Sequence, residues 1–278
     1  MSLRSRLSSR RRKLLLVTGG SGFLGRHLLN GHASDEWELI APSSTSMDVR
    51  RRESTIAAIT DWKPTAIAHL AYRKGDRPAI VDGSRHVAEA ATACGARLVH
   101  MSTDVVFPGR MAPYTERDEP FPLIDYGRDK LDADRAVLEA CPTAVVVRTS
   151  LLYGTGELGH VQLDVRQALH ADHRTSPPTF FTDEYRCPVH VDDVAAAVAR
   201  LASMPDVVGP LHVAGPEPLS RADFARRTAR WLGLDPARVR TGTIAESGLV
   251  RPARVVLDSA HATTLGITCR SVDVAYSR

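Results

Sequence analysis

The sequence predicts an α/β protein with a doubly wound parallel sheet and a small C-terminal lobe. Two observations lead to this class. Short apolar segments alternate with helical patterns through the first half of the 278-residue chain. The first apolar segment, residues 14–17, runs directly into a glycine-rich turn that is followed by a helical pattern. A strand, a glycine turn and a helix in this order indicate a Rossmann-type dinucleotide-binding fold.

The glycine turn contains Gly19, Gly22 and Gly25, each three residues after the one before. Their three tasks are to allow a tight turn with positive φ, to let the backbone approach a pyrophosphate, and to let the helix pack close to the strand. The pyrophosphate would lie at the positive end of the helix dipole. We therefore expect a dinucleotide at this turn.

The elements that follow alternate in the same way. Helix 79–94 ends at Gly95, a residue type suited to the left-handed conformation after a helix. The predicted strands are 38–41, 66–70, 97–101 and 144–148, and the other predicted helices are 54–60 and 125–140. A sheet of parallel strands joined by right-handed crossovers follows from this order.

Beyond Tyr153 the pattern becomes less regular. Helices are expected over 161–169 and 192–201, a strand over 211–213, and a further helix from a Ser220 cap to Leu232, closed by Gly233. We expect 13–155 with parts of 180–215 to form the NAD(P)-binding domain. The remainder of 156–278 would form a small substrate-binding lobe.

Charge and composition exclude several function classes. The formal charge of +4 becomes −2 without the six basic residues among the first thirteen, so we expect a flexible basic tail over 1–12 and no nucleic-acid partner. No apolar segment is long enough for a membrane span. The scattered Cys94, Cys141, Cys187 and Cys269 predict a reduced, cytoplasmic protein without a metal site.

The end of the second predicted strand bears on the choice of cofactor. An acidic residue commonly stands there in NAD-specific proteins, where it holds the ribose 2′-OH. Ser43 occupies this place, and Ser43, Ser44 or Arg26 can hydrogen-bond a 2′-phosphate. The sequence therefore favours NADP(H), with NAD(H) left open.

Three residues form a candidate catalytic set. The strand 97–101 delivers Thr103 to the carboxyl edge of the sheet, where ligands bind in such folds. Tyr126 and Lys130 lie four residues apart, on one face of a helix. We expect the Lys130 ammonium to lower the pKa of Tyr126 and to hold ribose hydroxyls. Tyr126 would then protonate a carbonyl oxygen to which Thr103 also donates.

These residues carry a resemblance to the extended short-chain dehydrogenases/reductases. The matching motifs are TGGSGFLG at 18–25, the set Thr103, Tyr126 and Lys130, and VHVDDVA at 189–195. Within that superfamily the chain most resembles the dTDP-4-dehydrorhamnose reductases, on LVHMSTDVVFPG at 98–109, VVRTSLLYG at 146–154 and RPARVVLD at 251–258. The resemblance implies an oxidoreductase that reduces the 4-keto group of a nucleotide-linked deoxysugar, as in dTDP-rhamnose biosynthesis.

The resemblance also implies which residues contact ligands. Gly22, Phe23 and Leu24 would lie at the pyrophosphate, Asp48 and Val49 at the adenine, and Leu70, Ala71 and Tyr72 along the dinucleotide. The full expected cofactor set is Gly19, Gly22, Phe23, Leu24, Gly25, Ser43, Asp48, Val49, Leu70, Ala71, Tyr72, Tyr126 and Lys130. The expected substrate residues are Val105, Phe107, Leu151 and Arg186.

Several positions depart from the pattern of that family. Asp82 stands where an Asn is usual, Leu151 replaces a Trp, and Glu184 and Arg186 replace a Gln and a Gly. We expect Arg186 to pair with the substrate diphosphate. These departures leave the sugar open.

Other polar residues have simpler expected roles. We expect the four histidines in strand patterns to be packed and hydrogen-bonded, Asp192 and Asp193 to cap a helix and fill its first turn, and four charged residues to form the solvated face of the catalytic helix. The histidines are His69, His100, His190 and His212, and the helix residues are Asp129, Asp132, Asp134 and Arg135.

Two alternative functions remain open from the sequence. The first is a nucleotide-sugar epimerase or dehydratase of the same superfamily, which returns its hydride. The second is a non-catalytic dinucleotide-binding subunit resembling the β-subunit of methionine adenosyltransferase. The oligomeric state is also open, with a homodimer as one candidate.

Overall fold

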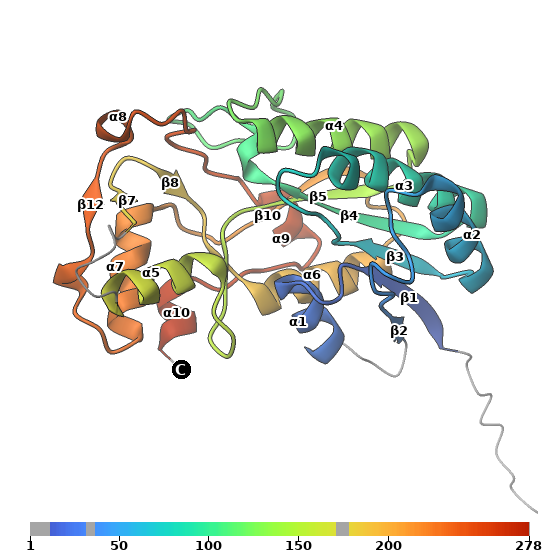
Figure 1. The fold of residues 1–278 in the computed structure, drawn as a ribbon, viewed down its shortest axis with the longest axis horizontal. Helices are drawn as coiled ribbons and strands as arrows, with labels where there is room; N and C mark the ends of the chain where they lie inside the picture. Colours follow the sequence, from blue (N-terminus) through green and yellow to red (C-terminus); the bar gives the residue numbers. More distant parts are fainter. Residues whose placement is uncertain (1–11, 32–36, 171–177, 278) are drawn as a thin grey trace, which may run out of the picture.

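The computed structural model describes residues 12–31, 37–170 and 178–277. Its centre is a six-stranded, fully parallel sheet in the order β2-β1-β3-β4-β5-β10 (Figure 1). The strands are β1 (Lys13–Thr18), β2 (Trp37–Ile40), β3 (Ala66–His69), β4 (Arg97–Thr103), β5 (Val145–Thr149) and β10 (Gly209–Val213). The predicted fold class is confirmed, and the strand order reverses between β1 and β3, where such sheets bind ligands.

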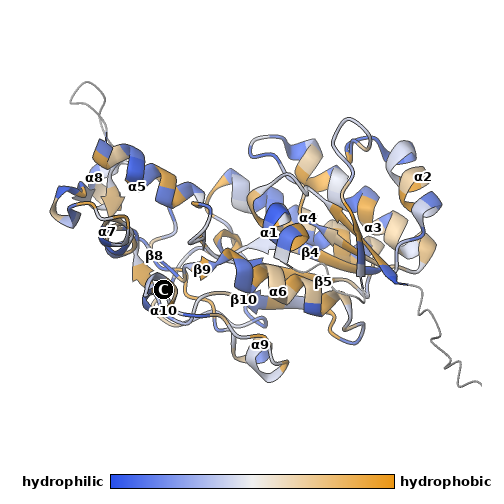
Figure 2. Ribbon diagram, turned by 90° about the horizontal axis from the view of Figure 1, so that it is seen from below, coloured by the Kyte–Doolittle hydropathy of each residue, from blue (hydrophilic) through white to orange (hydrophobic). Residues whose placement is uncertain are grey.

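Helices cover both faces of this sheet (Figure 1). One face carries α2 (Arg52–Trp62), α3 (Gly83–Cys94) and α4 (Asp125–Ala140), and the other carries α1 (Phe23–Gly31) and α6 (Val191–Ala202). Figure 2 shows hydrophobic residues along the central strands β4 and β5 and on α6. Each face has its own cluster of buried apolar side chains, which is why the strands read as nearly continuous apolar segments.

A smaller lobe lies beyond the carboxyl edge of the sheet (Figure 1). It contains α5 (His160–His170), α7 (Arg221–Trp231), α8 (Ile244–Ser247) and α10 (Val272–Tyr276). Its strand pairs are β6 (Leu152–Tyr153) with β9 (Val189–His190), β8 (Tyr185–Arg186) with β11 (Leu219–Ser220), and β7 (Phe180–Phe181) with β12 (Thr241–Gly242), and α9 (Ala260–Thr264) packs near β10. Our division of the chain at 155 and 180–215 stays a prediction.

The helix ends follow the sequence signals with one exception. Ser220 caps α7, and Gly95 and Gly233 have the positive φ angles expected after helices. At α6, however, the capping side chain is that of His190, whose Nδ1 accepts the backbone N–H of Asp192 at 3.2 Å. The expectation that Asp192 caps this helix is therefore wrong; it lies in the first turn.

Three further expectations concern the N-terminal tail, membrane spans and the cysteines. The predicted basic tail, except Arg12, lies outside the described residues. No helix in the described part of the chain is long and apolar enough to cross a membrane. Cys94, Cys141, Cys187 and Cys269 all carry free thiols.

Replacement of Gly19 by Ala tests the close packing of the glycine turn. Gly19 has φ 73°, and a Cβ there would lie 2.7 Å from the backbone N of Ala71. Gly233 has the same φ of 73° but open space around it. We expect Gly233→Ala to cost about 1 kcal/mol of unfolding free energy and Gly19→Ala about 2 kcal/mol or more in denaturant titrations. Equal losses would show that contact with Ala71 is unimportant.

Candidate active site

The first turn of α4 lies against the carboxyl end of β4. Gly127 makes this approach possible, because a Cβ at this position would overlap the carbonyl oxygen of Val105. The 3₁₀ turn of Asp104–Val106 continues directly from β4 and provides that carbonyl. The sequence analysis did not select Gly127, although it stands between the two helical residues of the predicted catalytic set.

The structure brings the predicted catalytic residues together at this point. The Tyr126 side chain lies close to that of Thr103, the last residue of β4, whose hydroxyl favours the ionised form of Tyr126. Lys130 is buried and its Nζ donates to the Met101 carbonyl oxygen at 2.5 Å, two residues earlier on the same strand. The Tyr72 ring lies 6.0 Å from the Tyr126 ring. Thr103, Tyr126 and Lys130 therefore belong to one site.

The predicted electrostatic effect on Tyr126 is not what the structure shows. Burial raises the pKa of Tyr126, and the neighbouring Tyr72 and Asp104 act in the same direction. The expected lowering of this pKa by Lys130 is therefore contradicted for the protein alone. Tyr126 is protonated at neutral pH, which is the form that can donate a proton.

Burial also changes the pKa of Lys130. Removal from water lowers the pKa of Lys130 to about 8, because the charged ammonium loses its hydration. The charge of Asp134, one helical turn later, opposes this shift. Lys130 thus carries its charge at neutral pH, but its pKa lies much closer to 7 than that of an exposed lysine.

The predicted dinucleotide site lies where the turn after β1 meets the segment after β3. The close approach of Gly19 to Ala71 aligns the turn after β1 with the segment after β3. The hydroxyl of Thr18 lies 2.7 Å from His69 Nδ1 and accepts the Ala71 N–H at 3.2 Å. His69 Nε2 lies 3.0 Å from Ser84 Oγ, whose proton goes to the Ile80 carbonyl. His69 is therefore a packed, hydrogen-bonded residue, as predicted, and it holds this backbone in place.

Asp48, Val49 and Ser43 are the residues predicted to lie near the adenosine. Val49 is buried and packs closely on Gly83, and hydrogen bonds from Arg50 lower the pKa of Asp48 to about 2. Ser43 is exposed, and its Oγ lies 2.7 Å from Thr45 Oγ1 and 3.1 Å from Ser46 Oγ. Arg26, an alternative 2′-phosphate partner, is instead ion-paired with Glu157.

Two predicted substrate residues are inside the protein. Phe107 is fully buried, with its ring stacked 4.2 Å from that of Tyr114. Arg186 is 2% exposed and lies between two carboxylates, 3.2 Å from Glu184 Oε1 and 3.7 Å from Asp104 Oδ2. Both side chains are thus covered by protein in this structure, and their contact with substrate stays a prediction. Val105 and Leu151 are half-buried.

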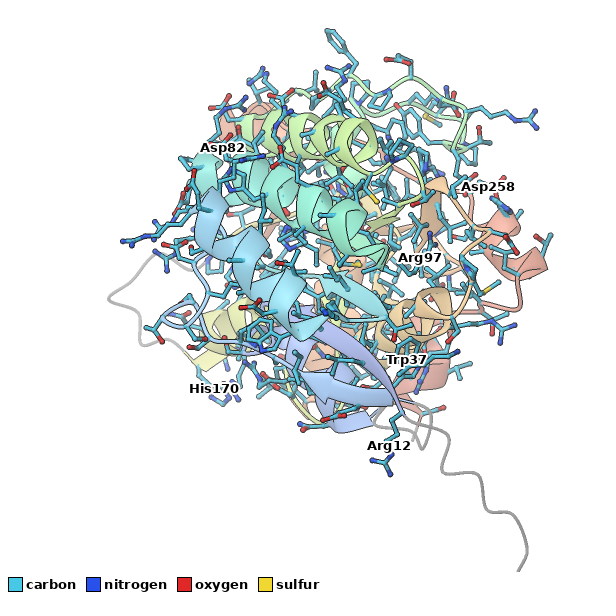
Figure 3. The ribbon with its side chains drawn as sticks, turned by 90° about the vertical axis from the view of Figure 1, so that its right-hand side faces the viewer. Arg12, Trp37, Asp82, Arg97, His170 and Asp258 are labelled. Atoms are coloured by element: carbon cyan, nitrogen blue, oxygen red, sulfur yellow. The ribbon has the colours of Figure 1, made fainter. Side chains whose placement is uncertain are left out.

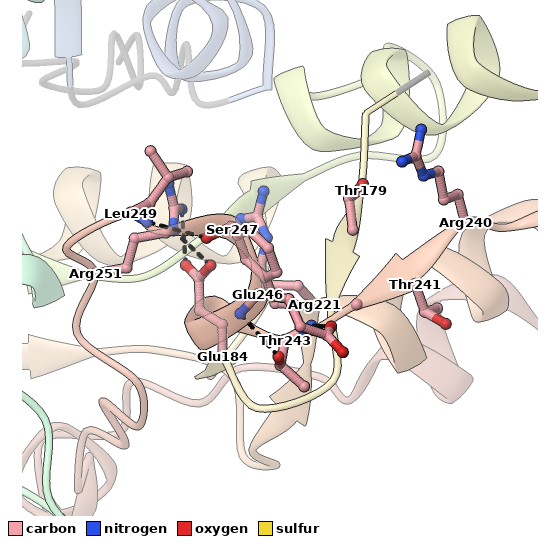
Figure 4. A pocket seen from close by; sticks show the side chains of 12 residues that line it. Thr179, Glu184, Arg221, Arg240, Thr241, Thr243, Glu246, Ser247, Leu249 and Arg251 are labelled. Carbon is pink, nitrogen blue, oxygen red and sulfur yellow. Dashed lines mark hydrogen bonds and ion pairs between the residues drawn. The ribbon is translucent and has the colours of Figure 1, made fainter. Parts of the chain in front are cut away.

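A cavity of about 530 Å³ lies in the smaller lobe (Figure 4). Arg221, Arg240 and Arg251 line it, together with Glu184, which accepts two hydrogen bonds from Arg251 at 2.7 and 2.9 Å. None of these arginines was among the site residues expected from the sequence, although Arg251 opens the RPARVVLD segment.

A chain of polar contacts links this cavity to the catalytic residues. From the cavity wall, Glu184 contacts Arg186 and Arg186 contacts Asp104. Asp104 accepts from the Thr103 hydroxyl at 3.4 Å and from the Ser150 hydroxyl at 2.6 Å. Burial raises the pKa of Asp104, and the Arg186 charge opposes this effect. Arg186 thus connects the two parts of the site from within the protein.

Several charged residues differ from their expected roles. Asp134 is 2% exposed, so its placement on a solvated helix face is wrong; Ser102 Oγ donates to it at 2.8 Å. Asp82 is exposed at the amino end of α3 (Figure 3). Asp192 pairs with His27 and Asp193 with Arg270. Among the described residues, no three His, Cys, Asp or Glu side chains gather as a metal site requires.

Comparison with known proteins identifies the family. The model of the RmlD substrate binding domain matches residues 12–272. The chain belongs to this family. The expectation of an oxidoreductase similar to the dTDP-4-dehydrorhamnose reductases is confirmed at this level.

The relatives of this RmlD-family protein include enzymes and a subunit of an enzyme complex. It is 33% identical to dTDP-4-dehydrorhamnose reductase of Mycobacterium tuberculosis, over 87% of this chain and 83% of the relative. It is 31% identical to methionine adenosyltransferase 2 subunit beta of Rattus norvegicus, over 92% and 84%. A dTDP-4-dehydrorhamnose reductase from Bacillus anthracis, solved with NADP, shares the fold with a TM-score of 0.86 at 23% identity, covering 96% and 98%.

Replacement of Arg186 by Met tests its role inside the protein. Without this arginine Asp104 would be a buried carboxylate without a cationic partner, so we expect a loss of about 3–5 kcal/mol in unfolding free energy. Arg128→Met removes an exposed pair with Asp125 and should cost under about 1 kcal/mol. Equal, small losses for both variants in urea titrations would contradict the buried ion pair.

Proposed function

We propose that this protein reduces the 4-keto group of a dTDP-linked deoxysugar, with NADP(H) as its preferred cofactor. The observation that carries the proposal is the convergence of Tyr126 and Thr103 at the end of β4, where Gly127 lets α4 approach the strand and Lys130 is buried beside it. The names of the relatives support the substrate class. A bound nicotinamide supplies the hydride in this chemistry.

The protein's own side chains supply and stabilise the proton transfer. Tyr126 donates its phenolic proton to the carbonyl oxygen as that oxygen gains negative charge. The Thr103 hydroxyl turns from Asp104 towards the same oxygen and stabilises it. The Lys130 ammonium then stabilises the tyrosinate that is left. In this scheme the raised pKa of Tyr126 keeps the phenol protonated until negative charge develops on the carbonyl oxygen.

The arginine-lined cavity provides the charge that a nucleotide diphosphate requires. Arg221, Arg240 and Arg251 come from three separate segments and converge on a space of about 530 Å³. Guanidinium groups bind phosphate oxygens through paired, charge-assisted hydrogen bonds. We assign the dTDP part of the substrate to this cavity and its sugar to the space between the cavity and Tyr126.

The preference for NADP(H) rests on the turn after β2. Three exposed hydroxyls, of Ser43, Thr45 and Ser46, cluster there without a carboxylate among them. Such donors are compatible with a 2′-phosphate, which an acidic residue would repel.

Loss of the Tyr126 hydroxyl tests the reaction. We expect Tyr126→Phe to lower kcat for NADPH oxidation with a dTDP-4-keto-6-deoxyhexose by about 100-fold or more, because the proton donor is removed. Tyr185→Phe removes a tyrosine hydroxyl from β8 in the smaller lobe, outside the assigned site residues, and serves as the control. Turnover that is equal in wild type and Tyr126→Phe would refute the proposed role.

Introduction of a carboxylate tests the cofactor preference. Ser43→Asp should weaken NADPH binding by about 10-fold or more, because the new charge repels the 2′-phosphate, while NADH binding stays close to that of the wild type. Ser43→Asn is the uncharged control. Fluorescence titration with both cofactors measures this, and an equal loss for NADH and NADPH would argue against a 2′-phosphate at Ser43.

A second candidate is a non-catalytic regulatory subunit. It is favoured by the 31% identity to methionine adenosyltransferase 2 subunit beta over 92% of this chain. Sedimentation of this protein with a methionine adenosyltransferase catalytic chain would distinguish the two. A stable complex, together with no turnover on any dTDP-4-keto sugar, would favour the subunit.

A further inference from the structure

A buried layer of polar side chains lies beneath α3 and α4 at the carboxyl end of the sheet. On this face Ile67, Leu98 and Val146 are apolar core residues. Two residues further along each strand, the side chains on the same face become His69 on β3, His100 on β4 and Arg148 on β5. All three are at most 4% exposed. The core thus changes from apolar to polar directly behind Lys130.

Asp134 is the carboxylate at the centre of this layer. Its Oδ2 accepts from Ser102 Oγ at 2.8 Å and lies 3.6 Å from Arg148 Nε, and its Oδ1 lies 3.5 Å from His100 Nε2. Asp134 follows Lys130 by four residues on α4, so both side chains lie on the face that meets the sheet. Burial of a carboxylate is costly, and a structural pair with Arg148 at 3.6 Å does not by itself account for it.

Several atoms of the layer lack hydrogen bonds within the described part of the chain. They are both ring nitrogens of His100, Asp134 Oδ1, and Nε and Nη1 of Arg148. Buried polar atoms that gather in this way are commonly bridged by ordered water. The contacts of 3.5 and 3.6 Å to Asp134 suit such bridging better than direct bonds.

We propose that Asp134 is a positioning residue that keeps Lys130 in its charged form, with His100, Arg148 and buried water completing the polar layer. Asp134 touches neither the sugar nor the cofactor in this account. It acts through Lys130, whose ammonium must be present when Tyr126 gives up its proton. The kinetic consequence rests on the function proposed above, whereas the effect on Lys130 itself does not.

Among the described groups that act on Lys130, Asp134 is the anion that can stabilise its ammonium. His69, His100 and Asp134 act electrostatically on Lys130, with Arg148 beside Asp134 and Tyr126 one helical turn before Lys130 on α4. Burial lowers the pKa of His69 and that of His100, the latter to about 4, so both are neutral at pH 7. Tyr126 is protonated and Arg148 is cationic. The favourable charge therefore comes from Asp134.

Lysine NMR measures this effect directly. The chain has four lysines, Lys13, Lys63, Lys74 and Lys130, so protein labelled with ¹³C at lysine Cε gives few signals, and Lys130→Arg identifies the one of interest. We expect Lys130 to titrate about one pH unit or more lower in Asp134→Asn than in the wild type. Asp134→Glu, which keeps the charge, should restore the wild-type value. Asp132→Asn, which alters only a surface pair with Arg77, should change nothing.

The kinetic readout has a defined sign. The ammonium exists below the pKa of Lys130, so activity should fall as pH rises through that value. A lower pKa in Asp134→Asn therefore moves the alkaline limb of the kcat/KM profile to lower pH. A profile and a Lys130 titration that are both unchanged in Asp134→Asn would overturn the proposal. An altered Lys130 titration without turnover in any variant would leave the role of Asp134 standing and reject the proposed reaction.

A double variant covers the case in which Asp134→Asn does not fold. Loss of the carboxylate leaves Arg148 buried without its partner, and this cost disappears when both charges are removed. We expect Lys130 to titrate about one pH unit lower in Asp134→Asn/Arg148→Gln than in Arg148→Gln alone. Equal values in these two variants would overturn the proposal.

Discussion

The candidate site depends on one packing constraint, the contact of the first turn of α4 with the end of β4. Gly127 permits it, since any side chain there would overlap the Val105 carbonyl. This contact places Tyr126 at the hydroxyl of Thr103 and leads Lys130 beneath the sheet edge to the Met101 carbonyl. The same approach removes both side chains from water. Because burial disfavours the charged form of each group, the pKa of Tyr126 rises and that of Lys130 falls.

Burial then requires compensating charges in the interior. Behind Lys130 the carboxylate of Asp134 lies among His100, Ser102 and Arg148. On the other side of Thr103, Arg186 lies between Asp104 and Glu184 and so joins the catalytic strand to the arginine-lined cavity. Both arrangements place charged groups inside the protein and not on exposed loops. The proposed catalytic residues therefore stand on the sheet and on α4, which suits a site that must hold its groups in fixed positions.

Local patterns predicted the fold and the residues whose roles depend on the backbone. Apolar periodicity and glycine spacing gave the parallel sheet, and the helix expected over 125–140 has those bounds in the structure. Thr103, Tyr126 and Lys130 could be selected because a strand end and a helical spacing fix them locally. The burial of Phe107, Asp134 and Arg186, and the raised pKa of Tyr126, depend on segments distant in sequence. Asp134 was expected on the solvated face because of its polar type, although its spacing of four residues from Lys130 places both on one face of α4.

The most direct measurement follows isotope from the cofactor to the sugar. Protein is mixed with a dTDP-4-keto-6-deoxyhexose and NADPH labelled with deuterium at the transferable position of nicotinamide C4, and the sugar is analysed by NMR and mass spectrometry. The account predicts one deuterium at C4 of the sugar for each NADP⁺ formed. Conversion of the sugar without net NADP⁺, or without deuterium at C4, would contradict it.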